Sequence, residues 1–232
     1  MVEQNQEVYN KIAKHFSDTR SWVTDDLVLL GKYVHDNDNV LDLACGNGRL
    51  YQLFSEDKRE SKIKYTGVDF SENLLAMAKE RFPNISVQAG DMRSIPCADS
   101  IFDVVFCLAA FHHLSSDTDR MIALEEIARV LKPGGTFVMT NWNVYSDWAK
   151  EKLKSGKWWY GVDEKEIVVP WRGGSGSVIG ERLYYAYTEE EIEKWCNNAG
   201  LKIKEQYIAT KKGGSTDAAE IGLNIVTIAT RQ

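Results

Sequence analysis

The chain has 232 residues, of which 44% are hydrophobic and 27% charged, and its formal net charge is −6. This length suits one α/β domain with room for a single large insertion, and the composition is that of an ordinary soluble globular protein. We find no apolar run of membrane-spanning length and no signal-peptide core in residues 1–6, so no membrane association is expected. The negative charge argues against a protein that coats nucleic acid with its whole surface, but it permits a local basic patch.

The cysteine pattern gives no sign of a metal site. The chain has four cysteines, at Cys45, Cys97, Cys107 and Cys196, and none of them forms a CxxC pair. We therefore expect no bound metal, no disulfide framework and a reducing cytoplasmic environment.

The first 141 residues alternate between helical and strand patterns. A helical stripe over residues 7–30 is interrupted around residues 17–21. Strands are predicted at residues 39–44, 63–69, 85–89, 101–108 and 136–141, and helices at 47–55, 71–82 and 117–131. Ser71 is a suitable N-cap for the second of these helices, and Pro83 ends it. This alternation predicts a mostly parallel sheet wound on both faces.

The pattern changes after the fifth strand. Residues 142–180 are rich in aromatic and lysine side chains and contain a glycine–serine run at 173–177. A helix at residues 189–199, capped by Thr188 with Glu191 three positions later, and strands at 201–209 and 223–230 follow. The glycine-rich segment 211–217 suits an antiparallel hairpin between those strands. We expect one domain over residues 1–232, with a helical entry segment at 1–35 and a substrate-side lid at 142–182.

Three acids are expected at the carboxyl ends of adjacent strands, where open α/β sheets bind ligands. The segment Asp42-Leu43-Ala44-Cys45-Gly46-Asn47-Gly48 forms a strand-to-helix turn in which the two glycines allow a close approach to a ligand. Asp69 ends the second strand, where an acid accepts hydrogen bonds from ribose hydroxyls, and Asp91 follows the third, where an acid can meet an adenine amino group.

The turn is a poor site for a dinucleotide. Tyr51 stands where the third glycine of G-x-G-x-x-G belongs, and Asp42 places a negative charge near the helix N-terminus that a pyrophosphate would need. S-Adenosylmethionine carries an ammonium, a sulfonium and a carboxylate but no phosphate. Acids together with backbone N–H groups suit it better.

Beyond this chemistry, the motifs VLDLACGNG, GVD, AGDM, FDVVFCLAAFHHL and EEIARVLKPGG over residues 40–141 resemble the S-adenosylmethionine-dependent, seven-stranded Rossmann-like methyltransferases. The resemblance implies an α/β fold with a doubly wound, mostly parallel seven-stranded sheet and an antiparallel C-terminal hairpin. It also implies cofactor contacts from Tyr9, Arg20, Asp42, Ala44, Gly46, Asn47, Gly48, Asp69, Asp91, Met92 and Leu108.

A narrower resemblance lies mostly outside this core. The tRNA wobble-uridine carboxymethyl methyltransferases, which include the methyltransferase domain of the AlkB-homologue tRNA enzymes, are similar to this chain at residues 8–20, 111–114 with Arg120, 169–171, 182–185 and the helix start at 189–192. The chain departs from that family's Arg-Tyr-Tyr-His pattern at residues 182–185. The eukaryotic relatives use a small zinc-binding partner protein, so an accessory subunit is compatible with the resemblance.

A carboxylate acceptor is already ionised at neutral pH and needs cations or hydrogen-bond donors to position it rather than a strong base. The candidates for this positioning role, by resemblance and by residue type, are Arg20, His112, His113, Arg172 and Arg182, and of these Arg20, His112, His113 and Arg182 are the predicted catalytic residues.

The sequence leaves three functions open. The lysines of residues 150–157, followed by Trp158, Trp159 and Tyr160, suit phosphate contacts and base stacking in a tRNA, but equally a lid over a metabolite or quinone-like acceptor. The third function is a non-catalytic cofactor-binding subunit, which the retained glycines and acids disfavour.

Overall fold

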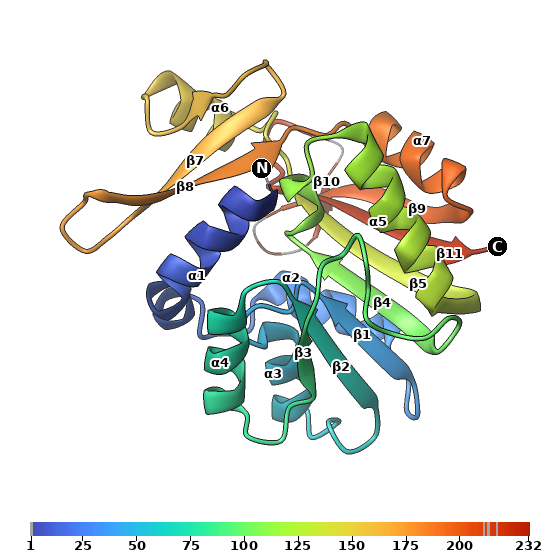
Figure 1. The fold of residues 1–232 in the computed structure, drawn as a ribbon. Coiled ribbons are helices and arrows are strands. Elements are labelled where there is room, and N and C mark those ends of the chain that lie inside the picture. The colour runs from blue at the N-terminus through green and yellow to red at the C-terminus, as the bar shows by residue number, and fades with distance from the viewer. Residues whose placement is uncertain (1, 211, 213, 217) are drawn as a thin grey trace.

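A computed structural model describes residues 2–210, 212, 214–216 and 218–232, in which one large sheet is flanked by helices and a second, smaller sheet projects beside it (Figure 1). The order of the large sheet is β10-β9-β11-β5-β4-β1-β2-β3. Its strands are β1 (Asn39–Leu43), β2 (Lys64–Asp69), β3 (Val87–Ala89), β4 (Phe102–Leu108), β5 (Leu131–Trp142), β9 (Leu201–Ala209), β10 (Ser215–Thr216) and β11 (Asn224–Arg231).

Strands β1 to β5 pair in parallel, whereas β11 is antiparallel to both β5 and β9. The predicted seven-stranded, mostly parallel sheet with an antiparallel C-terminal hairpin is therefore confirmed, and the two-residue β10 extends it at one edge. Residues 211, 213 and 217 of the predicted hairpin connection lie outside the described residues. Strand β11 begins at Asn224, one residue after the predicted start at 223.

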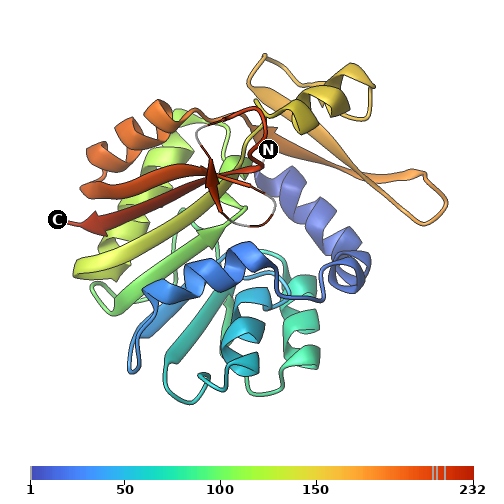
Figure 2. The same cartoon turned by 180° about the vertical axis from the view of Figure 1, so that it is seen from behind.

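Helices cover both faces of the large sheet (Figures 1 and 2). One face packs against α5 (Asp117–Val130) and α7 (Glu189–Asn198) through Leu124, Ile127 and Ile192, all almost fully buried. The other face packs against α2, η1, α3 and α4. Their bounds are Asp25–Leu30, Gly31–Tyr33, Arg49–Glu56 and Glu72–Arg81.

Local capping fixes several helix ends where the sequence predicts them. The Ser71 hydroxyl accepts a hydrogen bond from the Leu74 amide (3.2 Å) at the start of α4. Thr188 and Glu191 form a complete capping box at the start of α7. Several boundaries differ from the prediction by a few residues: β3 begins at Val87 rather than at residue 85, and β5 begins at Leu131 rather than at residue 136. Leu131 already pairs with Phe102, and a register shift follows before regular pairing resumes.

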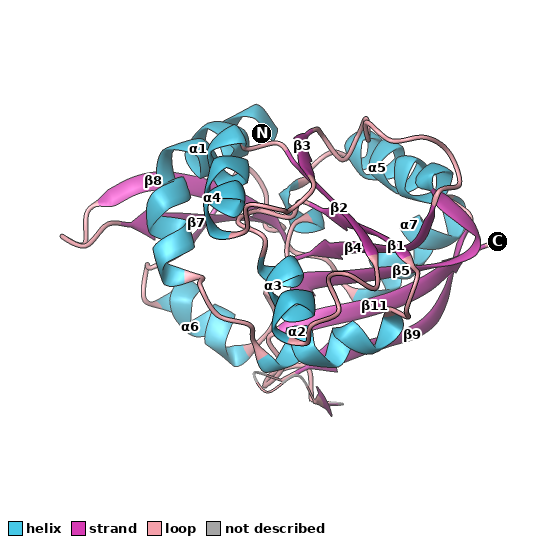
Figure 3. Ribbon diagram, turned by 90° about the horizontal axis from the view of Figure 1, so that it is seen from below, coloured by secondary structure: helices cyan, strands magenta, loops and turns pink. Residues whose placement is uncertain are grey.

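Residues 143–186, which we call the arm, contain one helix and the second sheet. The arm consists of α6 (Asp147–Lys154), β6 (Trp159–Tyr160), β7 (Glu166–Arg172) and β8 (Val178–Tyr185), with the antiparallel order β6-β7-β8. The arm and α1 (Val2–Thr19) lie together at one side of the large sheet (Figure 3).

The β7–β8 hairpin packs on α1, which in turn packs on α4. Gly180 permits this contact, because a Cβ at that position would lie 2.6 Å from Cγ1 of Val8.

Among the described residues, no helix is both long and apolar enough to cross a membrane, and no cluster of His, Cys, Asp and Glu side chains is arranged to hold a metal ion.

Candidate active site

A cavity of about 250 Å³ opens where β1, β2, β4 and β5 end, between the large sheet, α1 and the arm. The predicted site residues that line it are Tyr9, Arg20, Asp42, Ala44, Gly46, Asn47, Asp69, Asp91, Met92, Leu108, His113 and Arg182. They come from segments far apart in sequence, and the doubly wound topology brings them to one edge of the sheet.

Asp69 organises the glycine turn. Its two carboxylate oxygens accept hydrogen bonds from the backbone N–H groups of Gly46 and Ser71, each at 2.8 Å. The left-handed conformation of Gly46 (φ +54°) turns its amide toward this carboxylate. Burial raises the pKa of Asp69 to about 6. The carboxylate keeps further lone pairs with which to accept hydrogen bonds from a ligand.

Asp42 is a second buried acid in the cavity wall, with 3% of its surface exposed. The Tyr65 hydroxyl donates a hydrogen bond of 2.6 Å to its Oδ2. Burial, together with the charge of the neighbouring Asp69, raises the pKa of Asp42 to about 7 against the opposing effect of the Tyr65 hydrogen bond. Two buried carboxyls this close favour a cationic ligand, because a positive charge would stabilise both of them in the ionised form.

Asp91 lines the cavity but is already paired. Both of its oxygens accept hydrogen bonds from the guanidinium of Arg93, the shortest at 2.7 Å, and Arg93 also pairs with Asp119 at 3.0 Å. The ion pair fixes the orientation of the Asp91 carboxylate. The sequence prediction did not include Arg93.

The opposite wall carries two arginines on the faces of aromatic rings. The guanidinium of Arg182 lies 4.8 Å from the ring centroid of Trp171, and that of Arg20 lies 5.6 Å from the same ring. Arg182 is only 6% exposed, and its buried Nε has no hydrogen-bond partner. Burial lowers the pKa of Arg20, and the charge of Arg182 lowers it further.

Neither arginine forms an ion pair with a carboxylate among the described residues. Two neighbouring cations facing one cavity without a counter-ion form a site that suits an anion.

His113 holds Tyr9 beside these arginines. Its Nδ1 lies 2.9 Å from the Leu183 carbonyl oxygen, which can only accept, so Nδ1 carries the proton. Nε2 then accepts a hydrogen bond of 3.0 Å from the Tyr9 hydroxyl. Burial lowers the pKa of His113 to about 4, so the ring is neutral at pH 7. Burial also acts to lower the pKa of Arg182, but Tyr184 and Tyr9 beside it raise that pKa above its ordinary value.

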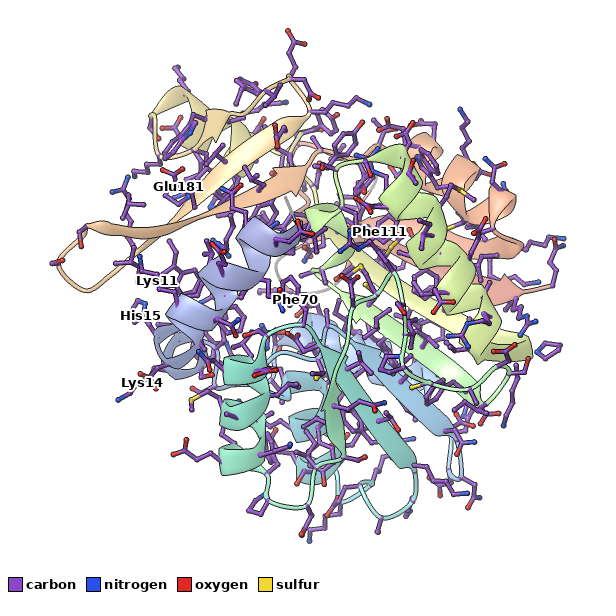
Figure 4. All side chains as sticks on the ribbon, in the orientation of Figure 1. Lys11, Lys14, His15, Phe70, Phe111 and Glu181 are labelled. Carbon is purple, nitrogen blue, oxygen red and sulfur yellow. The ribbon has the colours of Figure 1, made fainter. Side chains whose placement is uncertain are left out.

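Helix α1 is tied to the rest of the site by its polar side chains. His15, which Figure 4 labels on α1, accepts a hydrogen bond of 2.8 Å from the indole N–H of Trp171 on β7. Gln6 donates a hydrogen bond of 2.7 Å to the carbonyl of Phe70, which directly follows β2. The entry segment is therefore joined to both the arm and the sheet.

Two predicted site residues lie outside the cavity wall. Gly48 caps α3 with φ +80°, and a Cβ there would lie 3.1 Å from Ile85. His112 is buried behind Tyr184, against which its ring stacks at 4.5 Å and 21°. Burial holds the pKa of His112 well below its usual range. The structure therefore separates the two histidines, and only His113 faces the cavity.

Sequence reasoning omitted several residues of the cavity wall, among them Arg49, Phe70 and Trp142. Phe70 and Trp142 stand at or just after the carboxyl ends of β2 and β5, so the rule that already selected Asp69 could have found them. Arg49 begins α3 immediately after the glycine turn, and only the three-dimensional path of the chain shows that it reaches the cavity.

Residues 40–135 match the family model described as a methyltransferase domain. The chain is 31% identical to the tRNA (carboxymethyluridine(34)-5-O)-methyltransferase ALKBH8 of Mus musculus over 64% of this chain, but it spans only 21% of that protein's length. It is 29% identical to the tRNA (carboxymethyluridine(34)-5-O)-methyltransferase of Schizosaccharomyces pombe, with 86% of this chain and 89% of the relative covered.

A putative methyltransferase of Encephalitozoon cuniculi is 30% identical, with 84% of this chain and 85% of the relative covered. A demethylmenaquinone methyltransferase of Beutenbergia cavernae is 29% identical over 78% of this chain and 68% of that protein.

Solved structures share the fold. An S-adenosylmethionine-dependent methyltransferase from Clostridium acetobutylicum superposes with a TM-score of 0.69 at 20% identity, covering 96% of this chain and 98% of the other. A putative methyltransferase of Haloferax volcanii, solved in complex with the Trm112 methyltransferase activator, gives a TM-score of 0.65 at 22% identity over 99% of this chain and 97% of the other. The Encephalitozoon cuniculi relative is 30% identical to this chain over most of the length of both proteins. The chain therefore belongs to the S-adenosylmethionine-dependent methyltransferases.

Proposed function

We propose that this methyltransferase transfers a methyl group to the carboxylate of a carboxymethyl group on a wobble uridine of tRNA, which forms a methyl ester. The observation that carries the proposal is Arg182, a buried cation that faces the cavity beside Arg20 and has no carboxylate partner among the described residues. The tRNA methyltransferases among the relatives support the choice of acceptor.

The charged and polar side chains of the cavity fit S-adenosylmethionine. Asp42 would hold the ammonium of the cofactor, and Asp69 would accept hydrogen bonds from its ribose hydroxyls. Asn47 donates a hydrogen bond of 3.2 Å to the backbone carbonyl of Arg20, so Arg20 is fixed beside the glycine turn, where its guanidinium would meet the cofactor carboxylate. Asp91 would accept a hydrogen bond from the adenine amino group. When bound, the cofactor supplies an electrophilic methyl group on a sulfonium.

The protein's own contribution is to orient the acceptor and stabilise its charge. Arg182 would hold the acceptor carboxylate and orient it toward the bound cofactor. Tyr9, fixed by His113, would keep Arg182 in place from the side. No general base is needed, because the acceptor carboxylate is ionised at neutral pH and has no proton to lose.

A small aromatic acceptor is the second candidate, and one observation favours it. Trp142, Tyr184 and Trp158 form an aromatic wall, with Trp142 stacked on Tyr184 at 4.8 Å and on Trp158 at 5.6 Å. Such a wall could face a planar quinone-like ring, and the demethylmenaquinone methyltransferase among the relatives agrees with this. A quinone-like acceptor would leave the Arg182 cation without a partner, which is why we prefer the carboxylate.

The two candidates differ in a direct assay. Purified protein is incubated with labelled cofactor and one of three acceptors: an anticodon stem-loop with 5-carboxymethyluridine, the same RNA with plain uridine, or a soluble quinol. The proposal predicts label only in the carboxymethyluridine RNA. Label in the quinol and in neither RNA would overturn it. A parallel reaction with a Trm112-type activator tests whether this chain, like the Haloferax neighbour, works with an accessory protein.

A further inference from the structure

A second, open groove of about 580 Å³ adjoins the active-site cavity and shares Arg20, Trp142 and Arg182 with it. The groove extends from these residues along the arm. Lys152 and Trp148 line it from α6, Lys157 from the following turn, and Arg172 from the end of β7. A ligand with its reactive group in the cavity would therefore continue into this groove.

The groove wall is strongly basic. Among the described residues that line it, five are lysine or arginine and none is acidic. In the described part of the chain, neither Lys152 nor Lys157 pairs with a carboxylate, whereas Lys150 on the same helix lies 3.7 Å from Asp147. Arg172 donates a hydrogen bond of 3.1 Å to the hairpin carbonyl of Gly176 and pairs with no carboxylate among the described residues. The described residues therefore leave the positive charge along the groove uncompensated.

The groove also contains the exposed indole ring of Trp148, which neighbouring aromatic rings hold in place. Trp148 is 44% exposed, although its ring meets Trp158 edge-on at 4.9 Å and Trp142 at 5.9 Å. Lys152 Nζ lies 5.5 Å from the centroid of the Trp148 ring. An exposed ring that is held by two others can stack on a planar group with little loss of side-chain freedom, because its neighbours already restrict it.

We propose that this groove binds single-stranded RNA beside the acceptor nucleotide. Lys152, Lys157 and Arg172 contact backbone phosphates, and Trp148 stacks on a neighbouring base. A row of cations interleaved with an exposed aromatic ring is the arrangement that suits an unpaired strand, because phosphates and bases alternate along it. The inference rests on the proposed function, in which the acceptor is a nucleotide of an RNA chain.

The test measures RNA binding without methyl transfer. A fluorescent single-stranded oligonucleotide of plain uridines is titrated with full-length protein at several salt concentrations, and binding is followed by anisotropy. Each lost phosphate contact lowers the slope of log affinity against log salt by about 0.7, so the double variant Lys152→Ala/Lys157→Ala should lose about 1.4 from the wild-type slope. The matched control is Lys150→Ala/Lys154→Ala, which removes two charges from the same helix outside the groove and should keep the slope.

Stacking is tested separately. Trp148→Ala should weaken binding of the oligonucleotide by about 5- to 100-fold, while Trp148→Phe should retain most of the affinity. Thermal unfolding of each variant checks that the fold is intact. If the two lysine pairs have equal effects, or if Trp148→Ala binds as tightly as wild type, the proposal is wrong. Binding of acidic poly-glutamate in place of RNA, with the same lysine dependence, would also overturn it, because the groove would then accept protein rather than RNA.

This outcome is separable from that of the proposed function. The oligonucleotide carries no carboxymethyl group, so its binding does not depend on which acceptor is methylated. Groove-dependent RNA binding without methylation of carboxymethyluridine would overturn only the proposed function. Methylation of the carboxymethyl nucleoside without groove-dependent RNA binding would overturn only this inference.

Discussion

Binding of S-adenosylmethionine should weaken as the pH falls from 7.5 to 6, because Asp42 must be ionised to hold the cofactor ammonium. Burial raises the pKa of this carboxyl to about 7. Asp42 is therefore about three-quarters ionised at pH 7.5 and about one-tenth ionised at pH 6, which contributes a loss of about eightfold in affinity, and the partial protonation of Asp69 adds a factor of about two or less. The cofactor ammonium, with an α-amino pKa of about 8, remains largely protonated over this range.

The variant Asp42→Asn isolates this effect. The side-chain amide has the same shape, and its oxygen can still accept the hydrogen bond from Tyr65, which in wild type is 2.6 Å long. The variant should bind the cofactor weakly at every pH, with a change of about twofold or less between pH 7.5 and 6 from the partial protonation of Asp69, whose pKa is about 6.

The stability of the ligand-free protein should change in the opposite direction. The folded-state pKa of Asp42 lies above its unfolded value of about 4. Its contribution to the free energy of unfolding is therefore present in full below pH 4 and is lost as the pH rises through 7, by a total on the order of 4 kcal/mol. Asp42→Asn should accordingly be more stable than wild type at pH 8, as measured by urea unfolding.

Isothermal titration calorimetry at several pH values provides the affinities. Repeating it at pH 6.5 in buffers with different ionisation enthalpies measures proton release, which we expect to be larger for wild type than for Asp42→Asn by about three-quarters of a proton. An affinity for wild type that does not change with pH, or an equal pH dependence in the variant, would refute the reasoning.

Three further changes test other parts of the account. Arg182→Ala should reduce turnover on a carboxylate acceptor by about 30-fold or more while cofactor affinity stays within about twofold, since it removes a buried charge-assisted contact to the acceptor alone; a large loss of cofactor affinity in calorimetry would argue against that role. Leu124→Ala, in the fully buried face of α5, should lower the free energy of unfolding by about 2–5 kcal/mol in urea titration, and a smaller loss would mean that the site collapses around the gap. Thr188→Ala should lower the free energy of unfolding by about 1 kcal/mol, because it removes the capping box of α7. An unchanged melting temperature would show that the cap does not contribute to the stability of the protein.

Features set by neighbouring residues could be predicted from the sequence. Ser71 and Thr188 cap helices through amides three positions away, so a short segment contains all of the information. The position of Asp69 follows almost as directly, because a parallel strand places its last residues at the ligand edge of the sheet.

Features that depend on packing between distant segments could not be predicted. Arg20 and Arg182 share the ring of Trp171 only because α1 packs on β8, and that contact needs Gly180 next to Val8. Nothing local to any of these residues encodes the pairing. The same holds for His112 and His113, since adjacent positions gave no indication of which ring would be buried behind Tyr184.

The central claim is that the acceptor is an ionised carboxylate. The type of bond that joins the transferred methyl group to the tRNA tests this claim most directly. The protein is incubated with labelled cofactor and total tRNA from cells that lack this activity, and the purified tRNA is then treated with mild alkali. A methyl ester hydrolyses under these conditions, so the account predicts that the label is released as volatile methanol and that the Arg182→Ala reaction yields almost none. Label that remains on the tRNA after alkali would mean that the methyl group is attached to nitrogen, carbon or an ether oxygen, which would contradict the account.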